Sequence, residues 1–408
     1  MTFSDKYTVV FDGNHFLHKT LHVVNKIAAQ EGRTFNFIDD PEADKNLLLW
    51  KLSLDYCSEI KKFSSILENV VYAIDSSSWR KEYFPEEEIE KDPTLKYKGT
   101  RKYKEDFNWN LLYKAHDEFA KGLSEKKVKI VKIQGSEADD IVFAWSTYLN
   151  SNGKNCLIIS GDNDLLQLVN LDSSNGTNTL YYHKNRKKIY SYSGFSDWLS
   201  KKDKGVDIFN QPISLVDNTK DNLKAVLKYF ELEELNSEEF QFTKILVGDQ
   251  GDNVKPLYSI ERIYRSGKKE GDTWIKSLNS TESSKILAKF KETYHDDISE
   301  SLFWNFDYIK KICSITKKIC KLDHISIDQL IKNYEDNRNL MILNNRSIPP
   351  SIMEAMLSSV STLHKQTMDN SDINELRSYE NVLEKTTYSK ETKTSQNTSG
   401  FFGSFDLK

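Results

Sequence analysis

The 408-residue chain lacks the features that mark secreted and membrane proteins. It has only four cysteines, far apart and without CxxC spacing, which argues against a disulfide framework and against a zinc site. It has no run of about 18 apolar residues, and its N-terminus lacks a basic start followed by an apolar stretch. We therefore expect a protein of the reducing cytoplasm with no membrane segment.

The chain also has little net charge, −4 at pH 7, and this value alone argues weakly against nucleic acid as a partner. The charge is unevenly distributed, because basic residues gather at 101–104, 184–188 and 268–269. Each such run is by itself more often a solvated face than a binding site. Aromatic residues make up 12% of the chain, enough to fill the core of one large globular unit with appendages.

Short apolar runs predict four β-strands, at 7–11, 70–74, 128–133 and 156–159. Between them lie longer segments with helical spacing, 47–67 and 111–123. This alternation is typical of an α/β fold with a mainly parallel sheet flanked by helices. A β-hairpin is expected at 180–190, with its turn at 184–187.

From about residue 193 the pattern becomes mainly helical. We predict an α/β core at 1–200, a helical region at 201–363 and a flexible polar tail at 364–408. Helices of the second region are expected at 222–232, 240–246, 273–290, 302–315 and 352–363. Three segments are interpreted as insertions, at 32–45, 85–96 and 201–239.

Carboxylates follow each of the four predicted strands. They are Asp12 after the first, Asp75 at the end of the second, Glu137, Asp139 and Asp140 after the third, and Asp162 and Asp164 after the fourth. The carboxyl ends of parallel strands meet at one edge of a sheet, where ligands collect. Asp249 and Asp252 would join this edge if the helical region folds back onto it.

Nine carboxylates in a small volume need cations. A pair of like charges about 4 Å apart costs several kcal/mol at an intermediate dielectric constant. Ligation by oxygen alone suits hard ions such as Mg²⁺ or Mn²⁺. Two such ions about 4 Å apart could activate a water molecule and stabilise the leaving oxygen in phosphodiester hydrolysis. We therefore expect two divalent ions at this edge.

Each motif alone has a simpler interpretation. The stretch from Ser136 to Asp139 fits a capping box that opens a helix at 140–149, and Asp12 and Asp162 could be turn residues. His15, His18 and His22 share one helical face, but this helix should pack on the sheet, which argues against a histidine metal site. Four acidic motifs at one edge favour a functional explanation over coincidence.

Six motifs resemble those of the flap endonuclease superfamily of 5′-nucleases, and in particular the ribonuclease H of T-even bacteriophages. They are VVFDGNH, YAIDSSSWRKEYF, YKGTRKYKEDFNW, GSEADDIV, LIISGDNDLLQL and KILVGDQGDNV, which span residues 7 to 255 in the order of the family. A weaker likeness in NLMILNNRSIPPSIMEAML extends to residue 363. A phage origin would place the protein in the cytoplasm of its host.

The resemblance implies a PIN-like α/β core with a helical DNA-binding region, and 5′ to 3′ exonuclease, flap endonuclease and RNase H-type primer removal activities in DNA replication. It implies that two metal ions are held by two sets of acids. Nearest the first are Asp12, Asp75, Asp139 and Asp162, nearest the second are Asp164, Asp249 and Asp252, and Glu137 and Asp140 complete the shell. Asp75, Asp139 and Asp162 would be catalytic together with Lys98 and Arg101.

The resemblance also implies a gateway for DNA. Lys98 and Arg101 would contact the scissile phosphate, Tyr97 would stack on an end base, and Arg80 and Lys102 would line the DNA path. Without the family, this stretch is only a basic turn or the start of a helix. Cellular members carry a glycine-rich hairpin that binds duplex DNA with potassium, and the continuation VKPLYSIERIYRSGKK argues against potassium here.

The substrate implied is branched or RNA-primed DNA, bound by a monomer. After a polar stretch, residues 400–408 hold three phenylalanines, which either dock on the helical region or bind a sliding clamp or single-strand-binding protein. Two other functions were weighed. An RNA-directed PIN-type endonuclease would share the acidic edge but lack the GDxxDN element, and the intact set of nine acids argues against a non-catalytic replication factor.

Overall fold

The computed structural model describes residues 2–3, 6–102, 104–172, 176–203, 214–215, 220–263, 266, 272–295 and 297–382. Its centre is an eight-stranded sheet with the order β10-β8-β7-β5-β2-β3-β4, in which β6 pairs with β7. Only the β7–β8 and β6–β7 pairs are antiparallel. The strands are β2 (Tyr7–Asp12), β3 (Leu67–Ile74), β4 (Lys129–Lys132), β5 (Asn155–Ser160), β6 (Asn170–Asp172), β7 (Thr177–His183), β8 (Lys188–Tyr192) and β10 (Glu231–Leu235).

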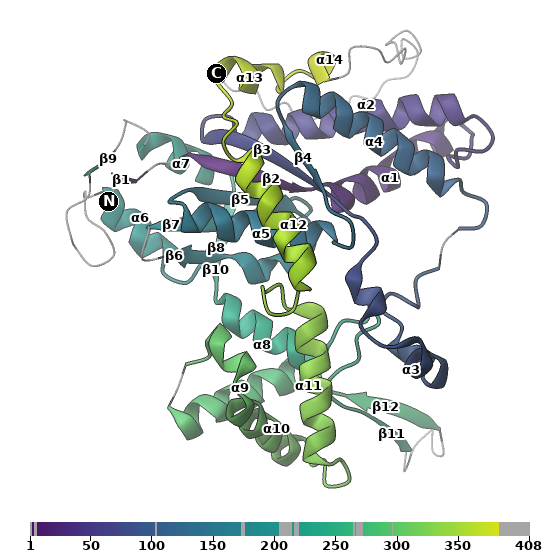
Figure 1. Ribbon diagram of the computed structural model, residues 1–408, viewed down its shortest axis with the longest axis vertical. Coiled ribbons are helices and arrows are strands. Elements are labelled where there is room, and N and C mark those ends of the chain that lie inside the picture. The colour runs from purple at the N-terminus through teal and green to yellow at the C-terminus, as the bar shows by residue number, and fades with distance from the viewer. Residues whose placement is uncertain are drawn as a thin grey trace.

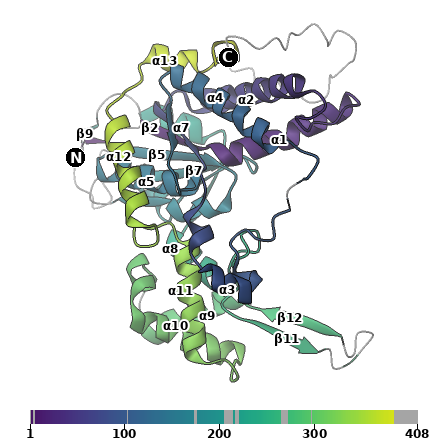
Figure 2. The same cartoon turned by 45° about the vertical axis from the view of Figure 1, so that its right-hand side comes forward.

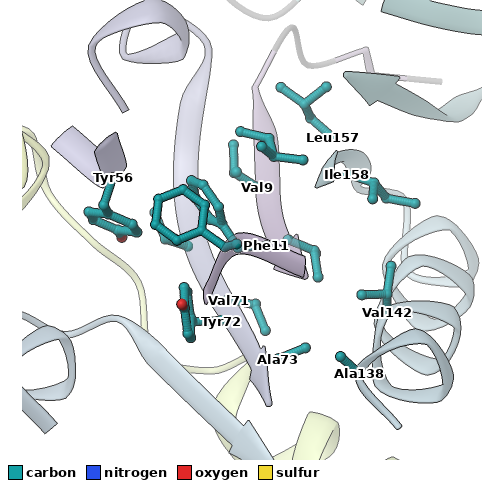
Figure 3. Close-up of a cluster of buried hydrophobic side chains, with 14 of the residues drawn as sticks. Val9, Phe11, Tyr56, Val71, Tyr72, Ala73, Ala138, Val142, Leu157 and Ile158 are labelled. Carbon is teal, nitrogen blue, oxygen red and sulfur yellow. The ribbon is translucent and has the colours of Figure 1, made fainter. Parts of the chain in front are cut away.

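The four predicted strands and the predicted hairpin are confirmed. The central strands β2 and β5 are buried along their whole length, which explains their continuous apolar sequences. On one side of the sheet the Phe11 ring lies 5.0 Å from the Tyr56 ring, centroid to centroid, and near Tyr72 (Figure 3). On the other side, Ile158 lies near Val142 of the covering helix (Figure 3).

Helices cover both faces of the sheet (Figure 1). On one face lie α1 (Gly13–Gln30), α2 (Pro41–Phe63) and α4 (Trp109–Glu125), and on the other α5 (Ala138–Ser151), backed by α12 (Pro350–Leu363). The N-cap of helix α5 lies one residue later in the sequence than Ser136, the N-cap of the predicted capping box. This N-cap is Glu137, whose backbone N–H donates to the Asp140 carboxylate at 3.1 Å, so Ser136 is not the cap.

A second hydrophobic core holds the helical region together. It is built by α8 (Ser237–Val247), α9 (Ser280–Tyr294), α10 (Phe306–Cys320) and α11 (Ile327–Met341), around side chains such as Phe242, Phe290 and Tyr334. The helix predicted at 273–290 is wrong in its first part. Thr273–Ser277 form strand β12, paired with β11 (Ser259–Ile263) in an arm that projects from the region (Figure 2). Helix α9 starts only after Asn279, whose side chain caps it.

The core extends beyond its predicted limit at residue 200. Strand β10 joins the sheet beside β8, although its first two residues were expected to end the helix predicted at 222–232. Ile373, Leu376 and Val382 are buried in the core of the sheet layer, so residues up to 382 belong to the fold although they lie within the predicted tail. Residues 383–408, the rest of that tail, lie outside the described residues.

The remaining elements are short connections. Those between β3 and α4 are η1 (Trp79–Glu82), α3 (Glu86–Lys91) and η2 (Pro93–Leu95). The others are β1 (Thr2–Phe3), η3 (Asn163–Leu168), α6 (Phe195–Asp203), β9 (Ser214–Leu215), α7 (Lys220–Leu227), η4 (Glu300–Trp304), α13 (Asn370–Glu375) and α14 (Tyr379–Val382). Across the described residues, no helix combines the length and the apolar character that crossing a membrane requires.

Candidate active site

Four carboxylates at the strand ends form no ion pair in the described part of the chain, and we call them the open carboxylates. They are Asp12 at the end of β2, Asp75 directly after β3, Asp139 in the first turn of α5, and Asp162 after β5. Their charges act on one another: in addition to burial, those of Asp162 and Asp75 raise the pKa of Asp12, and those of Asp162 and Asp12 raise the pKa of Asp139. The structure therefore brings together acids that lie up to 150 residues apart in sequence, as the strand pattern predicted.

Local hydrogen bonds position the open carboxylates. The Asp12 carboxylate accepts the Ser160 hydroxyl at 2.7 Å and the backbone N–H of His15 at 2.9 Å. The Ser160 oxygen in turn accepts the N–H of Asp162 at 3.1 Å, which links the ends of β2 and β5. On the other side, Asp75 accepts the N–H of Ala138 at 2.6 Å, which fixes it against the start of α5. The sequence analysis missed Ser160.

The open carboxylates lie together without a protein cation; Asp12 is buried and the other three are half-buried. Burial, helped by the nearby Asp162, raises the pKa of Asp12 to about 7 against the hydrogen bond from His15. Burial and the Glu137 charge raise the pKa of Asp75 to about 6, and burial with the charges of Asp162 and Asp12 raises the pKa of Asp139 well above its usual range. Such shifts mark a cluster that favours an added cation.

Five further carboxylates are bound by protein cations, and we call them the paired carboxylates: Glu137, Asp140, Asp164, Asp249 and Asp252. Arg80 holds two of them. Its Nη2 lies 2.7 Å from Asp140 Oδ1, its Nη1 lies 3.2 Å from Glu137 Oε2, and its Nε donates to the carbonyl of Leu340 at 2.7 Å. Because Leu340 lies in the last turn of α11, this arginine also connects the helical region to the core.

Arg80 and Tyr97 do not occupy the positions that the sequence analysis gave them. Arg80 is 3% exposed and its guanidinium is fully engaged, so its role here is structural and not the predicted DNA contact. Tyr97 is 6% exposed and packs against Val254, so its ring offers no face to a base in this structure. Its hydroxyl donates to Asp252 at 2.7 Å or to Glu137 at 3.0 Å.

The predicted gateway cations lie at the acidic edge. Lys98 Nζ pairs with Glu137 and lies 4.0 Å from Asp252 Oδ2, while Arg101 Nη2 lies 2.6 Å from Asp252 Oδ1. The Arg101 side chain is 47% exposed, and Lys102 beside it is also exposed. The Lys98 and Arg101 charges, together with the Tyr97 hydrogen bond, lower the pKa of Asp252 against the effect of burial.

Lys244 is a site residue that the sequence analysis missed. It lies in the last turn of α8, is 7% exposed, and places Nζ 2.5 Å from Asp164 Oδ1 and 3.4 Å from Asp249 Oδ2. It therefore bridges a core carboxylate and a carboxylate of the helical region. A lysine five residues before Asp249 on a predicted helix was a weak local signal, but its pairing with Asp164 depends on the tertiary fold.

The donor set fits hard divalent ions, because every candidate ligand is a carboxylate oxygen and the open carboxylates have no protein cation of their own. Within the part of the chain that the structure describes, no three acidic, histidine or cysteine side chains form a ready metal site. The paired carboxylates hold lysine and arginine instead. Asp140 is fully buried between Arg80 and the start of α5, which makes it a support for the site and a poor ligand.

Known proteins are similar to this chain in sequence. Residues 7–197 match the family described as 5′-3′ exonuclease, N-terminal resolvase-like domain. A protein of Mycoplasmopsis pulmonis (strain UAB CTIP) named 5′-3′ exonuclease is 25% identical over 324 residues, which cover 78% of this chain and 82% of that protein. These matches support a relationship of the chain to the PIN-like 5′-nuclease superfamily.

Two solved structures of bacteriophage T5 proteins are also similar to this chain. One is a flap endonuclease in a complex with DNA and metal ions, which is 14% identical to this chain with a TM-score of 0.47. The match covers 88% of this chain and 100% of the flap endonuclease chain. A protein co-crystallised with metal ions is 15% identical with a TM-score of 0.46, and covers 91% of this chain and 100% of that one.

Proposed function

We propose that this chain is a divalent-metal-dependent 5′-nuclease that hydrolyses phosphodiester bonds in flap or RNA-primed DNA during replication. The observation that carries the proposal is the set of open carboxylates, which lie together, are buried or half-buried, and form no ion pair with a protein cation among the described residues. A protein that only binds nucleic acid has no use for uncompensated acids where phosphate must approach. A nuclease needs them as ligands.

The ligands divide into two sets. Asp12, Asp75, Asp139 and Asp162 would hold one Mg²⁺ or Mn²⁺ ion, and Asp164, Asp249 and Asp252, with Glu137 beside them, would hold a second. Such ions, when bound, act as Lewis acids on the phosphate and the attacking water. Ser160 and the start of α5 keep Asp12 and Asp75 in place, so little rearrangement is required of the first set.

Lys98 and Arg101 are proposed to contact the scissile phosphate. Both lie at the edge of the acidic site, and a cation held there stabilises the negative charge that develops on the phosphate during displacement. Exposed Lys102 lies next along the chain and would bind DNA beyond the site.

Cleavage of a 5′-labelled DNA flap, with and without Mg²⁺, tests this function. We expect cleavage near the branch point with Mg²⁺ and none in EDTA. Asp162→Asn should remove activity, while the control Asp117→Asn, which changes an exposed carboxylate of α4 that pairs with Lys132 and is not a proposed metal ligand, should retain it. Cleavage in EDTA, or full activity of Asp162→Asn, would refute the metal assignment.

The same assay distinguishes the rival functions. A single-stranded RNA substrate cleaved faster than the DNA flap would favour an RNA-directed endonuclease. Tight flap binding without cleavage by the wild-type chain would favour a non-catalytic replication factor. An RNA-primed duplex degraded from its 5′ end would support a role in primer removal.

A further inference from the structure

The segment between α3 and α4 is attached to the GDxxDN loop of the helical region. We call residues 92–101 the gateway segment and residues 249–255 the acidic loop. The Lys98 backbone N–H donates to the Asp252 carbonyl at 2.8 Å, and the Asn253 side chain donates to the Lys96 carbonyl at 2.9 Å. A surface pair between Lys255 and Asp92, at 3.0 Å, lies at the far end.

The side chains of the gateway segment bind proposed metal ligands. Lys98 pairs with Glu137, Arg101 pairs with Asp252, and the Tyr97 hydroxyl lies within hydrogen-bond distance of both carboxylates. All three residues were expected to contact DNA. In this structure all three are engaged with the acids instead, although the Arg101 side chain remains 47% exposed.

The attached state carries a local backbone cost. Lys98 has a φ of 56°, in the left-handed region that non-glycine residues avoid, which costs about 1 kcal/mol. The hydrogen bond from its N–H to Asp252 and the pair with Glu137 maintain this conformation. Loss of these contacts would therefore also relieve strain.

We propose that the gateway segment is a latch that divalent metal releases: the ion competes with Lys98 and Arg101 for Glu137 and Asp252, and frees both cations for the phosphate. The proposal rests on the proposed function, because it uses the same ligands. A divalent ion bound to these carboxylates occupies the oxygens that Lys98 and Arg101 contact, and its charge repels both side chains. Metal binding is thereby coupled to the release of Lys98 and Arg101, so these cations become available to the phosphate only when the metal needed for catalysis is bound.

The affinity for metal in the absence of DNA tests the latch, because the latch predicts that loss of Lys98 tightens metal binding, whereas a purely structural role predicts that it weakens it. Mn²⁺ is titrated by calorimetry into the full chain and into Lys98→Met. Removing the competing cation should tighten Mn²⁺ binding by about tenfold, since a partly buried ion pair of this kind opposes the metal by an amount of that order. A residue needed only for structure would weaken binding when replaced. Lys98→Gln serves as a second variant, and circular dichroism checks that both are folded.

The matched control is Lys104→Met, which removes an exposed lysine in the same connection before α4. It changes the charge by the same amount, so general electrostatics would affect both variants equally. We expect the Mn²⁺ affinity of Lys104→Met to stay within about twofold of wild type, because its charge is screened by solvent.

Hydrogen exchange measures the release itself. In EDTA the amide of Lys98 should be protected by its bond to Asp252, and saturating Mn²⁺ should speed exchange in a peptide covering 92–102 by about tenfold or more. Amides of the buried strand β2 should not change.

Each outcome decides between the two proposals. If wild type binds Mn²⁺ but Lys98→Met binds it equally or more weakly, or exchange at 92–102 does not rise, the latch is overturned and the nuclease proposal stands. If wild type binds no Mn²⁺, both the metal assignment and the latch are overturned. Tighter binding by Lys98→Met with faster exchange in wild type supports the latch, whatever the substrate proves to be.

Discussion

The open and the paired carboxylates lie at the same edge of the sheet, yet the protein treats their charge in opposite ways. Backbone and hydroxyl donors position Asp12 and Asp75, and none of the four open carboxylates has an ion pair among the described residues. The paired carboxylates are bound by Arg80, Lys98, Arg101 and Lys244. The first set is left for an external cation, and the second set is used to assemble the site.

The difference follows from where the chain supplies each residue. Three of the open carboxylates come directly after strands of the sheet and the fourth opens α5, so the rigid core alone places them. The paired set brings core acids together with the gateway segment and the helical region, through ion pairs such as Arg80–Asp140 and Arg101–Asp252, whose residues are 60 and 151 positions apart. Protein cations are needed there because several segments must be held together.

The largest expected effect is on catalysis by the open carboxylates. Asp75→Asn and Asp162→Asn should each lower the cleavage rate by on the order of a thousandfold, or about 4 kcal/mol of barrier, because a metal ligand is lost. DNA binding should be unchanged or tighter, since a negative charge near phosphate is removed. Single-turnover rates and equilibrium binding measure both. More than a tenth of wild-type rate in both variants would contradict the division of roles.

Arg80 tests the structural role of the paired set. Arg80→Met should lower the free energy of unfolding by about 3 to 5 kcal/mol, because Asp140 is left buried without its partner. Urea denaturation measures this loss. The double variant with Asp140→Asn should lose less stability than the sum of the losses in the two single variants, because both substitutions remove the same interaction. A stable Arg80→Met protein with weaker DNA affinity would restore the predicted DNA contact.

Lys98 and Arg101 are expected to act on the chemical step. Lys98→Ala and Arg101→Ala should each slow single turnover at saturating substrate by about a hundredfold, the usual loss for one group that stabilises transition-state charge. The dissociation constant for DNA should change far less. Unchanged rates with weaker affinity would make both residues simple electrostatic contacts.

Thermal stability without metal compares the two sets directly. In EDTA, Asp139→Asn should raise the melting temperature by roughly 3 °C, because it relieves repulsion among buried acids. Asp140→Asn should lower it, because it removes the partner of Arg80. Excess Mg²⁺ should reverse the advantage of Asp139→Asn. A loss of stability in both variants in EDTA would mean that the open carboxylates are not under strain.

The smallest effect concerns the C-terminus, which lies outside the described residues. Deletion of residues 400–408 should leave cleavage of a free flap unchanged, because these residues follow the last helix of the core by 17 positions or more. It should remove any stimulation by the cognate sliding clamp. A lower melting temperature would instead favour docking of the tail on its own chain, and persisting stimulation would rule out the clamp tether.

The sequence determined the parts of the site that depend on local pattern. Short apolar runs predicted β2, β3, β4 and β5. Strands β2, β3 and β5 are buried along almost their whole length, as expected of strands covered on both faces, whereas β4 carries lysines at both ends. Acids that follow such strands must meet at one edge, so the open carboxylates were predictable before any tertiary contact was known. The same local logic missed β11 and β12, because a short solvent-exposed ribbon has no buried face to impose a two-residue period.

Tertiary structure alone decided which charges are balanced. The neighbouring sequence does not indicate that Arg80 pairs with Asp140 or that Lys244 pairs with Asp164, because the partners are 60 and 80 residues apart. The burial of Tyr97 likewise depends on the acidic loop, which the chain supplies some 150 residues later. Sequence patterns report on neighbours along a strand or helix, whereas desolvation and ion pairing depend on the elements that pack around a side chain. The acids were therefore predictable, and their protein cations were not.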